Sequence, residues 1–400
     1  MQNQRLDLLT LQEAMDMLGV SRATIDRWRK DKQLPFIKIG KEILLEKQKL
    51  NAWIQLHSHA GPHPKQPKEM SDSDRIVSVG YQSGAALLWS PLIIKKLGLF
   101  EEELQRMCPS AQYQVRWVNS PNGIELVEGL IAGRVHIASL GDYPMIACQT
   151  LSQILPNFKP TFLAFDGKTS HGGGISLVVP SSSPFQRIED LAESTISIVA
   201  NSSASCRLGE MMSSFGLDQE PVIHRRMGEC LNGIVEGSIG ASVLWEPYLS
   251  WVQWLGKGIP IGSEAAGGDY LTGLMADEQW LLRNEVVMIA YMKAHLRAHD
   301  LIRRAPLRAA EMIHEASGFP MQVVTSVLSQ IRWDASLYSR DLQTLANMKF
   351  QGAERLPGHQ RKYDGFAVQE QYLLHAVEAL KLPVLPDSPL PGEWSPEMIY

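Results

Sequence analysis

The chain has 400 residues, of which 44% are hydrophobic and 20% are charged, the balance of an ordinary globular protein. This length and composition predict two or three domains and exclude a wholly disordered chain. No apolar run approaches the roughly 18 residues that a membrane helix needs, so we expect no membrane partner. The first residues lack the pattern of a secretory signal, so we expect a cytoplasmic location.

The formal net charge of −5 is unevenly distributed along the chain. Residues 1–60 carry ten Lys and Arg against seven Asp and Glu, a net charge of +3, which leaves −8 for residues 61–400. A basic segment ahead of an acidic body points to nucleic acid as a partner of that segment alone. The four cysteines lack CxxC spacing, and there is no dinucleotide, phosphate-loop or HExxH motif, so we predict no metal site and no cofactor.

The first 56 residues predict a small DNA-binding domain. Thr10 and Glu13 form a capping-box pattern that begins a helix, and Gly19 allows the chain to turn after it. Ser21 is a good N-cap for a second, basic helix over residues 22–32. Residues 36–39 and 43–45 flank a Gly-Lys turn and predict a hairpin wing. The side chains predicted to contact DNA are Ser21, Arg22, Thr24, Arg27, Arg29, Lys30, Lys38 and Lys41.

The string LTLQEAMDMLGVSRATIDRWRK resembles the small winged helix-turn-helix domain of the excisionase and MerR-related regulators, over about residues 8–55. That resemblance implies a double-stranded DNA operator as partner. The second wing strand is usually basic in that family, whereas residues 43–45 are Ile-Leu-Leu here. The alternative is a helical protein-interaction module with solvated basic residues.

Residues 57–74 are polar and contain three prolines, which predicts a semi-extended linker. Residues 75–375 are predicted to form one domain, in which short apolar strands first alternate with helical stretches and the part past about residue 285 is largely helical. This pattern predicts an α/β fold with a mostly parallel sheet. Residues 376–400 are expected to form a last short helix and a Pro-rich tail. Ligands of parallel sheets bind at the carboxyl ends of the strands, so the loops there carry the candidate site.

Three of these loops contain small or hydroxyl residues at a predicted helix start, where backbone amides favour an anion. They are residues 80–86, 139–144 and 200–205. Trp245, Glu246 and Tyr248 add an aromatic wall with a carboxylate, and Asp269 with Tyr270 offers a second such pair. If the Glu246 carboxylate faces the cavity, we expect a zwitterion such as taurine to bind more tightly than an inorganic anion.

In order, the strings GYQSGAALLWSPL, VHIASLGDYPMI, STISIVANSSAS and GASVLWEPYL resemble the substrate-binding proteins of ABC transporters for aliphatic sulfonates, taurine and nitrate. The resemblance covers about residues 75–350 and implies a two-lobed, type II periplasmic-binding-protein (Venus-flytrap) domain. It implies that the ligand-binding cleft is lined by Gln82, Gly84, Ala85, Asp142, Ser202, Ser203, Ser205, Glu246 and Tyr248.

The two resemblances together predict a cytoplasmic transcriptional regulator that senses a small anion such as a sulfonate and acts as a homodimer. We expect no enzymatic activity. Two alternatives stay open. One is a desulfinase-like enzyme, in which Cys206 is the nucleophile and His171 and Arg207 assist. The other is a transporter substrate-binding protein.

Overall fold

The computed structural model describes residues 8–18, 22, 25–26, 29, 34–39, 42–46, 49–50, 75–262, 268–348, 367–385 and 388–400. The chain divides into two compact units, Met1–Ser71 and Asp72–Tyr400. The division falls within the predicted linker 57–74, which itself lies outside the described residues. None of the described helices has the length and apolar character that a membrane span requires.

In the N-terminal unit, β1 (Leu8–Thr10) leads directly into α1 (Leu11–Leu18). The predicted capping box is present, since Glu13 Oε2 accepts a bond of 2.8 Å from the Thr10 amide and Thr10 Oγ1 accepts one of 3.2 Å from the Glu13 amide. The predicted hairpin forms as β2 (Ile37–Ile39) and β3 (Glu42–Glu46). Contrary to expectation, β1 adds a third antiparallel strand beside β3, which buries Leu45 between α1 and the sheet.

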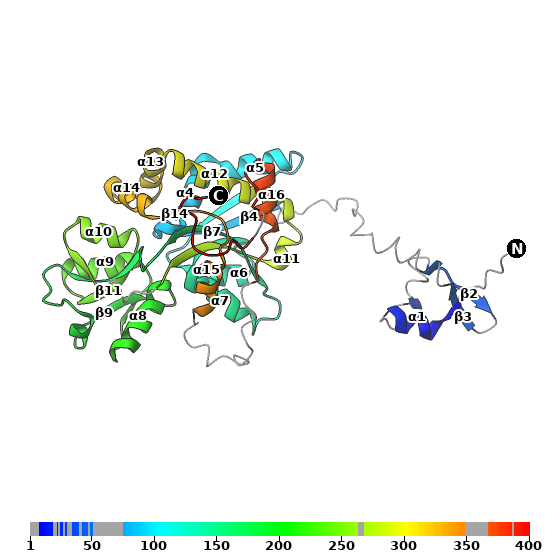
Figure 1. Cartoon of the computed structure of the whole chain (residues 1–400), viewed down its shortest axis with the longest axis horizontal. Coiled ribbons are helices and arrows are strands. Elements are labelled where there is room, and N and C mark those ends of the chain that lie inside the picture. The colour runs from blue at the N-terminus through cyan, green and yellow to red at the C-terminus, as the bar shows by residue number, and fades with distance from the viewer. Residues whose placement is uncertain are drawn as a thin grey trace. The chain divides into compact units, whose positions relative to one another are not determined.

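The C-terminal unit, which we call the body, has two lobes, each with its own sheet (Figure 1). The first lobe has the strand order β14-β7-β13-β6-β4-β5 and the second β10-β9-β11-β8-β12. The strands of the first lobe are β4 (Ile76–Tyr81), β5 (Gln114–Asn119), β6 (Ile137–Gly141), β7 (Pro160–Thr169), β13 (Tyr270–Asp277) and β14 (Arg332–Trp333). Those of the second are β8 (Ile175–Pro180), β9 (Ile196–Val199), β10 (Val222–His224), β11 (Ala241–Trp245) and β12 (Gly258–Ile261).

The expectation of mostly parallel sheets is wrong. Among the described strands of the body, four neighbouring pairs are parallel and five are antiparallel. The reason is that the chain passes from the first sheet to the second between β7 and β8, and returns between β12 and β13. These crossing strands enter the sheets antiparallel to their neighbours β6 and β11.

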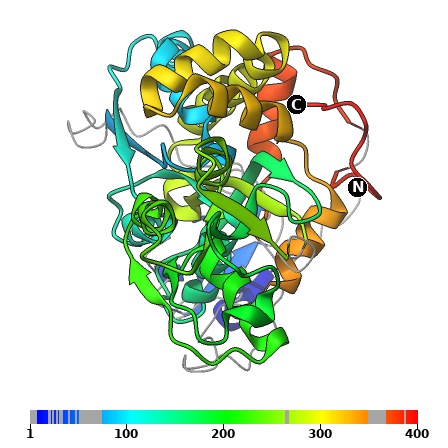
Figure 2. The ribbon, with the colours of Figure 1, turned by 90° about the vertical axis from the view of Figure 1, so that its left-hand side faces the viewer.

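Helices cover both sheets and the region that joins them. The first lobe carries η2 (Ala86–Leu88), α4 (Ser90–Leu97), α5 (Leu99–Met107), α6 (Gly123–Ile131), α7 (Asp142–Ser152) and α11 (Glu278–Leu281). The second lobe carries η3 (Ile188–Leu191), α8 (Ser203–Phe215), α9 (Met227–Glu236) and α10 (Tyr248–Trp254). The last helices are α12 (Glu285–Arg304), α13 (Pro306–Ser317), α14 (Met321–Gln330), α15 (Ser339–Asn347) and α16 (Gln371–Ala379). They cross back over both lobes: α12 and α13 contact α4, whereas α14 contacts α10, and Figure 2 shows α13 and α14, in yellow to yellow-orange, above the second lobe.

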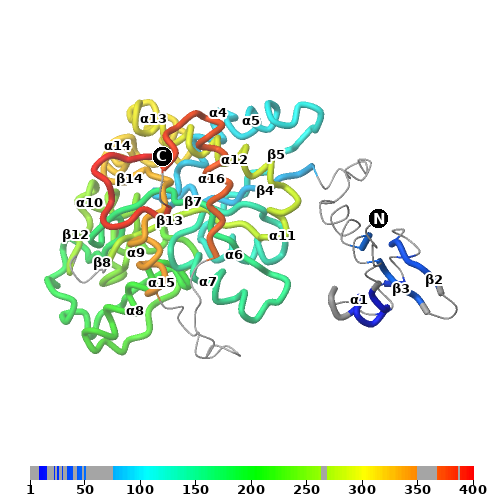
Figure 3. Tube along the Cα trace, turned by 45° about the vertical axis from the view of Figure 1, so that its right-hand side comes forward, coloured from blue at the N-terminus to red at the C-terminus, as the bar shows by residue number. Residues whose placement is uncertain are grey.

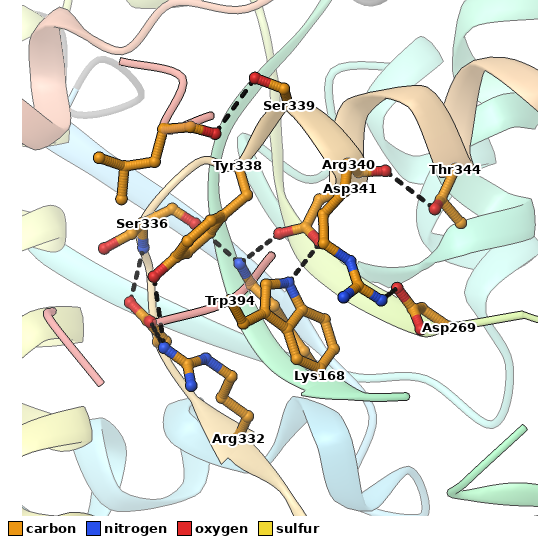
Figure 4. A network of polar contacts seen from close by, with 12 residues as sticks. Lys168, Asp269, Arg332, Ser336, Tyr338, Ser339, Arg340, Asp341, Thr344 and Trp394 are labelled. Atoms are coloured by element: carbon orange, nitrogen blue, oxygen red, sulfur yellow. Dashed lines mark hydrogen bonds and ion pairs between the residues drawn. The ribbon is translucent and has the colours of Figure 1, made fainter. Parts of the chain in front are cut away.

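The final helix lies earlier than predicted, at Gln371–Ala379, and the residues after it fold back onto the body beside β14 (Figure 3). The backbone oxygen of Tyr400 accepts a bond of 3.1 Å from the Ala335 amide, and the Tyr400 side chain is buried. Figure 4 shows the indole of Trp394 donating to Asp341, which also pairs with the fully buried Lys168. The tail is therefore part of the packed body.

Candidate functional site

The loops that the sequence singled out meet where the two lobes face each other. The indole nitrogen of Trp245, in the second lobe, donates a bond of 2.8 Å to the backbone oxygen of Gly84 in the first. Two residues after Gly84, the Ala86 amide donates a bond of 2.8 Å to the backbone oxygen of Glu246. Residues far apart in the sequence thus form one boundary between the lobes.

The serines that begin α8 bond mainly to one another. Ser202 Oγ accepts from the Ser205 amide at 3.2 Å, and Ser205 Oγ accepts from the Ser202 amide at 2.9 Å, which is a reciprocal cap. Ser202 Oγ also donates to the backbone oxygen of Val199. The local sequence is typical both of a cap and of an anion cradle, and in this structure the two hydroxyl groups serve the cap.

A buried ion pair crosses the boundary beside these serines. Arg207 on α8 donates a bond of 2.8 Å to Asp142 on α7, and both side chains are almost fully buried. Burial opposes the charge on Arg207, but the carboxylate of Asp142 outweighs it, so the pKa of Arg207 is raised. Gly141 allows this approach, because a Cβ there would lie 2.9 Å from Ser203 Oγ. Arg207 was not predicted to line the cleft, although its position just after the small residues that begin α8 would have indicated it.

Glu246 does not face a cavity. Its side chain is 4% exposed, and its two oxygens accept from the amide of Ser250 at 3.0 Å and from the Ser250 hydroxyl at 2.8 Å. Burial raises the pKa of Glu246 to about 7, although the bonds from Ser250 oppose this shift. The carboxyl group therefore caps α10. Because it does not face the cavity, it does not favour binding of a zwitterion such as taurine.

Between the lobes lies a cavity of about 300 Å³, which we call the inter-lobe cavity. It is lined by Ser83, Gly84, Asn119, Ser120, Pro121, Arg226, Met227, Trp245, Tyr248, Ser317 and Phe319. Of the predicted ligand residues, Gly84 and Tyr248 are in this set, together with Trp245 of the predicted aromatic wall. Gln82, Ala85, Ser202 and Ser203 line a separate space of about 10 Å³, enough for about one water. Asp269 lines a third hollow, beside Cys206, and Asp142, Ser205 and Glu246 line none of the three.

Arg226 is the cationic side chain of the inter-lobe cavity, and it was not predicted from the sequence. It lies directly before α9, is exposed, and forms no ion pair with a carboxylate of the described residues. Opposite it, Ser83 and Asn119 hold each other: the Ser83 amide donates to Asn119 Oδ1 at 3.0 Å, and Asn119 Nδ2 donates to Ser83 Oγ at 2.9 Å. A cation therefore faces ordered neutral polar groups across the cavity, which suits an anion.

A second polar cluster lies inside the first lobe. Single ligand atoms of Asp166, His295 and His299 lie within 4.8 Å of one another, and all three side chains are fully buried. Burial lowers the pKa of His295 to about 4 and that of His299 to about 3. The four ring nitrogens already contact Ser90, the backbone oxygens of Phe165 and Tyr400, and Asp166. Because each ring nitrogen already has a partner, the cluster fits a hydrogen-bonded core with neutral imidazoles better than a metal site.

In the N-terminal unit, three of the predicted DNA-contacting residues are described. The side chain of Arg22 is 72% exposed and that of Lys38 is exposed on β2. Arg29 instead pairs with Asp26 at 2.8 Å and lies over the ring of Phe36 at 4.1 Å, so its side chain is only 19% exposed. The remaining predicted contacts, Ser21, Thr24, Arg27, Lys30 and Lys41, lie outside the described residues.

Comparisons with known families match both parts of the chain. Residues 8–57 match the model of a helix-turn-helix domain. Residues 93–243 match a family described as ABC transporter, phosphonate, periplasmic substrate-binding protein.

A Bacillus subtilis (strain 168) protein, whose name proposes that it binds aliphatic sulfonates, is 28% identical over 164 residues, which are 40% of this chain and 46% of that one. The match thus spans about half the length of this curated relative. The alkanesulfonate-binding protein of Xanthomonas axonopodis pv. citri, solved with bound MOPS, superimposes with a TM-score of 0.58 at 18% identity, over 74% of this chain and 98% of that one. The periplasmic nitrate-binding protein of Synechocystis PCC 6803 gives 0.58 at 12% identity, over 77% and 90%. The chain therefore carries a helix-turn-helix domain at its N-terminus, followed by a domain with the fold of periplasmic substrate-binding proteins.

Proposed function

We propose that this chain is a cytoplasmic one-component transcriptional regulator, which binds a double-stranded DNA operator through its N-terminal unit and senses a small organic oxyanion in its body. The observation that carries the proposal is the presence, on one chain, of a helix-turn-helix domain and a two-lobed binding fold with a cationic inter-lobe cavity. A substrate-binding protein that only delivers its ligand to a transporter has no use for a DNA-binding domain. The fused domain therefore favours a sensor over a delivery protein.

The mechanism follows from the position of the cavity. Its walls come from both lobes, with Ser83 and Asn119 on the first and Arg226 and Tyr248 on the second. An anion that contacts both walls prefers the conformation in which the lobes are together, and so shifts the population toward it. To change DNA binding, this preference must amount to a few kcal/mol. Because one small N-terminal unit covers little DNA, we propose a homodimer on a two-fold symmetric operator.

The environment of Cys206 gives the enzymatic alternative little support. Burial raises the pKa of Cys206 to about 12, and the carboxylate of Glu210, whose Oε1 lies 3.9 Å from Sγ, adds to the shift. A thiol in this state is protonated at neutral pH and is a poor nucleophile. Arg207, the proposed assisting cation, is engaged with Asp142, and His171 is an exposed loop residue. We therefore expect no turnover of a sulfinate.

The test uses the full chain. Duplexes that it binds are selected from a random pool, and their affinity is then measured by fluorescence anisotropy with and without methanesulfonate, taurine, sulfate, nitrate and methylphosphonate. We expect a two-fold symmetric site whose affinity changes with at least one organic anion. Binding of an anion without any selected DNA would instead support a substrate-binding protein. DNA binding that no anion alters would contradict the sensor.

A further inference from the structure

In the described part of the body, the chain crosses between the lobes at two places, which we together call the hinge. They are residues 170–174, between β7 and β8, and residues 268–269, directly before β13. The two segments bond to each other, since the Gly172 amide donates a bond of 3.0 Å to the backbone oxygen of Gly268. A rotation of one lobe against the other has to change backbone torsion angles in the hinge. The contacts of Asp269 therefore depend on the relative position of the lobes.

Two arginines hold Asp269 from different sides. Its backbone oxygen accepts a bond of 3.3 Å from Arg207 on α8 of the second lobe, and its carboxylate, which is 7% exposed, pairs with Arg340 on α15. Beside these contacts lies a hollow of about 260 Å³, lined from α8 by Arg207 and from α15 by Thr344 and Asn347. Because side chains do not fill this hollow, α8 has room to shift relative to α15.

The same guanidinium also holds the C-terminal tail. Arg340 pairs with Glu393 and lies over the ring of Trp394, with 4.6 Å between the guanidinium carbon and the ring centroid. Figure 4 shows the Arg340 guanidinium with Asp269 on one side and Trp394 on the other. The side chain of Glu393 is 83% exposed. Arg340 therefore connects a buried carboxylate of the hinge with the outer surface of the body.

The tail is thinly attached around these contacts, over residues 388–395, which we call the strap. The Leu390 amide donates a bond of 2.8 Å to the backbone oxygen of Leu337, and the Ser395 amide donates one of 3.2 Å to Tyr338 Oη. Between these two amides, residues 391–393 are exposed. A segment with few buried contacts opens at a lower free energy than the core, so the strap can detach while the body stays folded.

We propose that the strap reports the relative position of the lobes, with Arg340 as the link between hinge and strap. While Asp269 holds the guanidinium, Arg340 is oriented toward Glu393 and the ring of Trp394. When the hinge moves and Asp269 withdraws, Arg340 loses the carboxylate that orients it, and its ion pair and cation–π contact with the strap weaken. The inference concerns the body alone, and so does not rest on the proposed function.

Hydrogen–deuterium exchange of the full chain, followed by mass spectrometry, tests the proposal. Trp245→Phe removes the bond between the lobes to the backbone oxygen of Gly84 and touches no residue of the strap. We expect the exchange of a peptide that covers residues 388–395 to rise, by about fivefold if the whole shift in lobe position reaches the strap. In the Arg340→Gln background, where the strap exchanges faster from the start, Trp245→Phe should cause no further rise.

A matched pair of variants examines the strap itself. Glu393→Gln removes the exposed partner of Arg340 and should raise the exchange of the strap without unfolding the body. The control is Glu397→Gln, an exposed glutamate of the same tail, which should leave that exchange unchanged. Peptides from β4, a buried strand of the first sheet, give the rate of exchange that follows unfolding of the whole body.

The possible outcomes are distinct. A strap that exchanges no faster than β4 in the natural chain would be a rigid part of the body and would overturn the proposal. An equal rise on Trp245→Phe with and without Arg340 would remove Arg340 as the link. No rise in either background would show that strap and lobes are independent, which would also overturn the proposal.

Discussion

The carboxylate of Asp142 lies 2.8 Å from the guanidinium of Arg207, and this pair joins α7 of the first lobe to α8 of the second. Arg207 also donates to the backbone oxygens of Ser203 and Asp269, at 3.2 and 3.3 Å, and lies over the ring of Tyr270. The guanidinium is therefore surrounded by acceptors, and the Arg207 side chain is only 6% exposed. Such a pair stabilises the contact between the lobes without any bound ligand.

We predict that either Asp142→Asn or Arg207→Gln lowers the free energy of unfolding of the body by about 3 to 5 kcal/mol, because the remaining charge is buried without its partner. The double variant should cost less than the sum of the single variants, since it leaves no lone charge. Urea unfolding followed by tryptophan fluorescence measures both effects. Asp300→Asn removes a pair with Arg304 that is largely exposed, and this control should change nothing measurable. Single variants that behave like the control would contradict a stabilising pair.

The buried carboxyl group of Glu246 predicts a dependence of stability on pH. Its pKa is raised from 4.5 to about 7, so the folded chain binds a proton that the unfolded chain has already released in this range. The contribution of Glu246 to the free energy of unfolding therefore falls as the pH rises from about 4.5 to 7, and levels off above that. The fall is about 3 kcal/mol at most, at 1.36 kcal/mol for each pH unit.

Glu246→Gln isolates this effect. The stability of the variant relative to the natural chain should increase between pH 5 and pH 8, because glutamine has no proton to release. His295 and His299, whose lowered pKa values act in the opposite direction, contribute equally to both proteins and cancel in the difference. Urea unfolding at several pH values gives the difference directly, and a flat difference would show that Glu246 titrates normally.

The C-terminal tail depends on a second buried ion pair. Lys168 Nζ lies 2.6 Å from Asp341, both side chains are fully buried, and the indole of Trp394 donates to the other oxygen of Asp341 at 2.7 Å (Figure 4). We predict that Asp341→Asn costs about 3 to 5 kcal/mol, because it removes the carboxylate that contacts the buried Lys168 ammonium directly. Trp394→Phe removes one hydrogen bond and should cost about 1 kcal/mol. Thermal and urea unfolding compare the two, with the exposed Glu315→Gln as a neutral control; equal effects of the two tail variants would contradict a central role for Asp341.

The sequence predicted local structure well and long-range pairing poorly. The capping box of Thr10 and Glu13 and the hairpin of residues 36–39 and 43–45 follow the prediction, since each is determined by residues close together in the sequence. The antiparallel crossing strands were missed because strand direction depends on neighbours far away in the chain. The same limit applies to the site: Arg207 finds its partner 65 positions away, and Arg226 is recognisable as a cavity residue only once the lobes are assembled.

In the N-terminal unit, Arg22 and Arg29 were both predicted to contact DNA, but their surroundings differ. The side chain of Arg22 is 72% exposed, and its Nε lies 4.0 Å from Asp26. Arg29 is 19% exposed and is held between Asp26, at 2.8 Å, and the ring of Phe36. We predict that Arg22→Gln weakens binding to any duplex and reduces the slope of log affinity against log salt concentration by about 1, because one phosphate contact is lost. Arg29→Gln should lower the melting temperature of the N-terminal unit and leave that slope nearly unchanged. Fluorescence anisotropy with a labelled duplex over a series of NaCl concentrations measures the slope, with Arg304→Gln in the body as control. An equal loss of slope in both N-terminal variants would place Arg29 on the DNA as well, and would mean that its contacts with Asp26 and Phe36 give way when DNA binds.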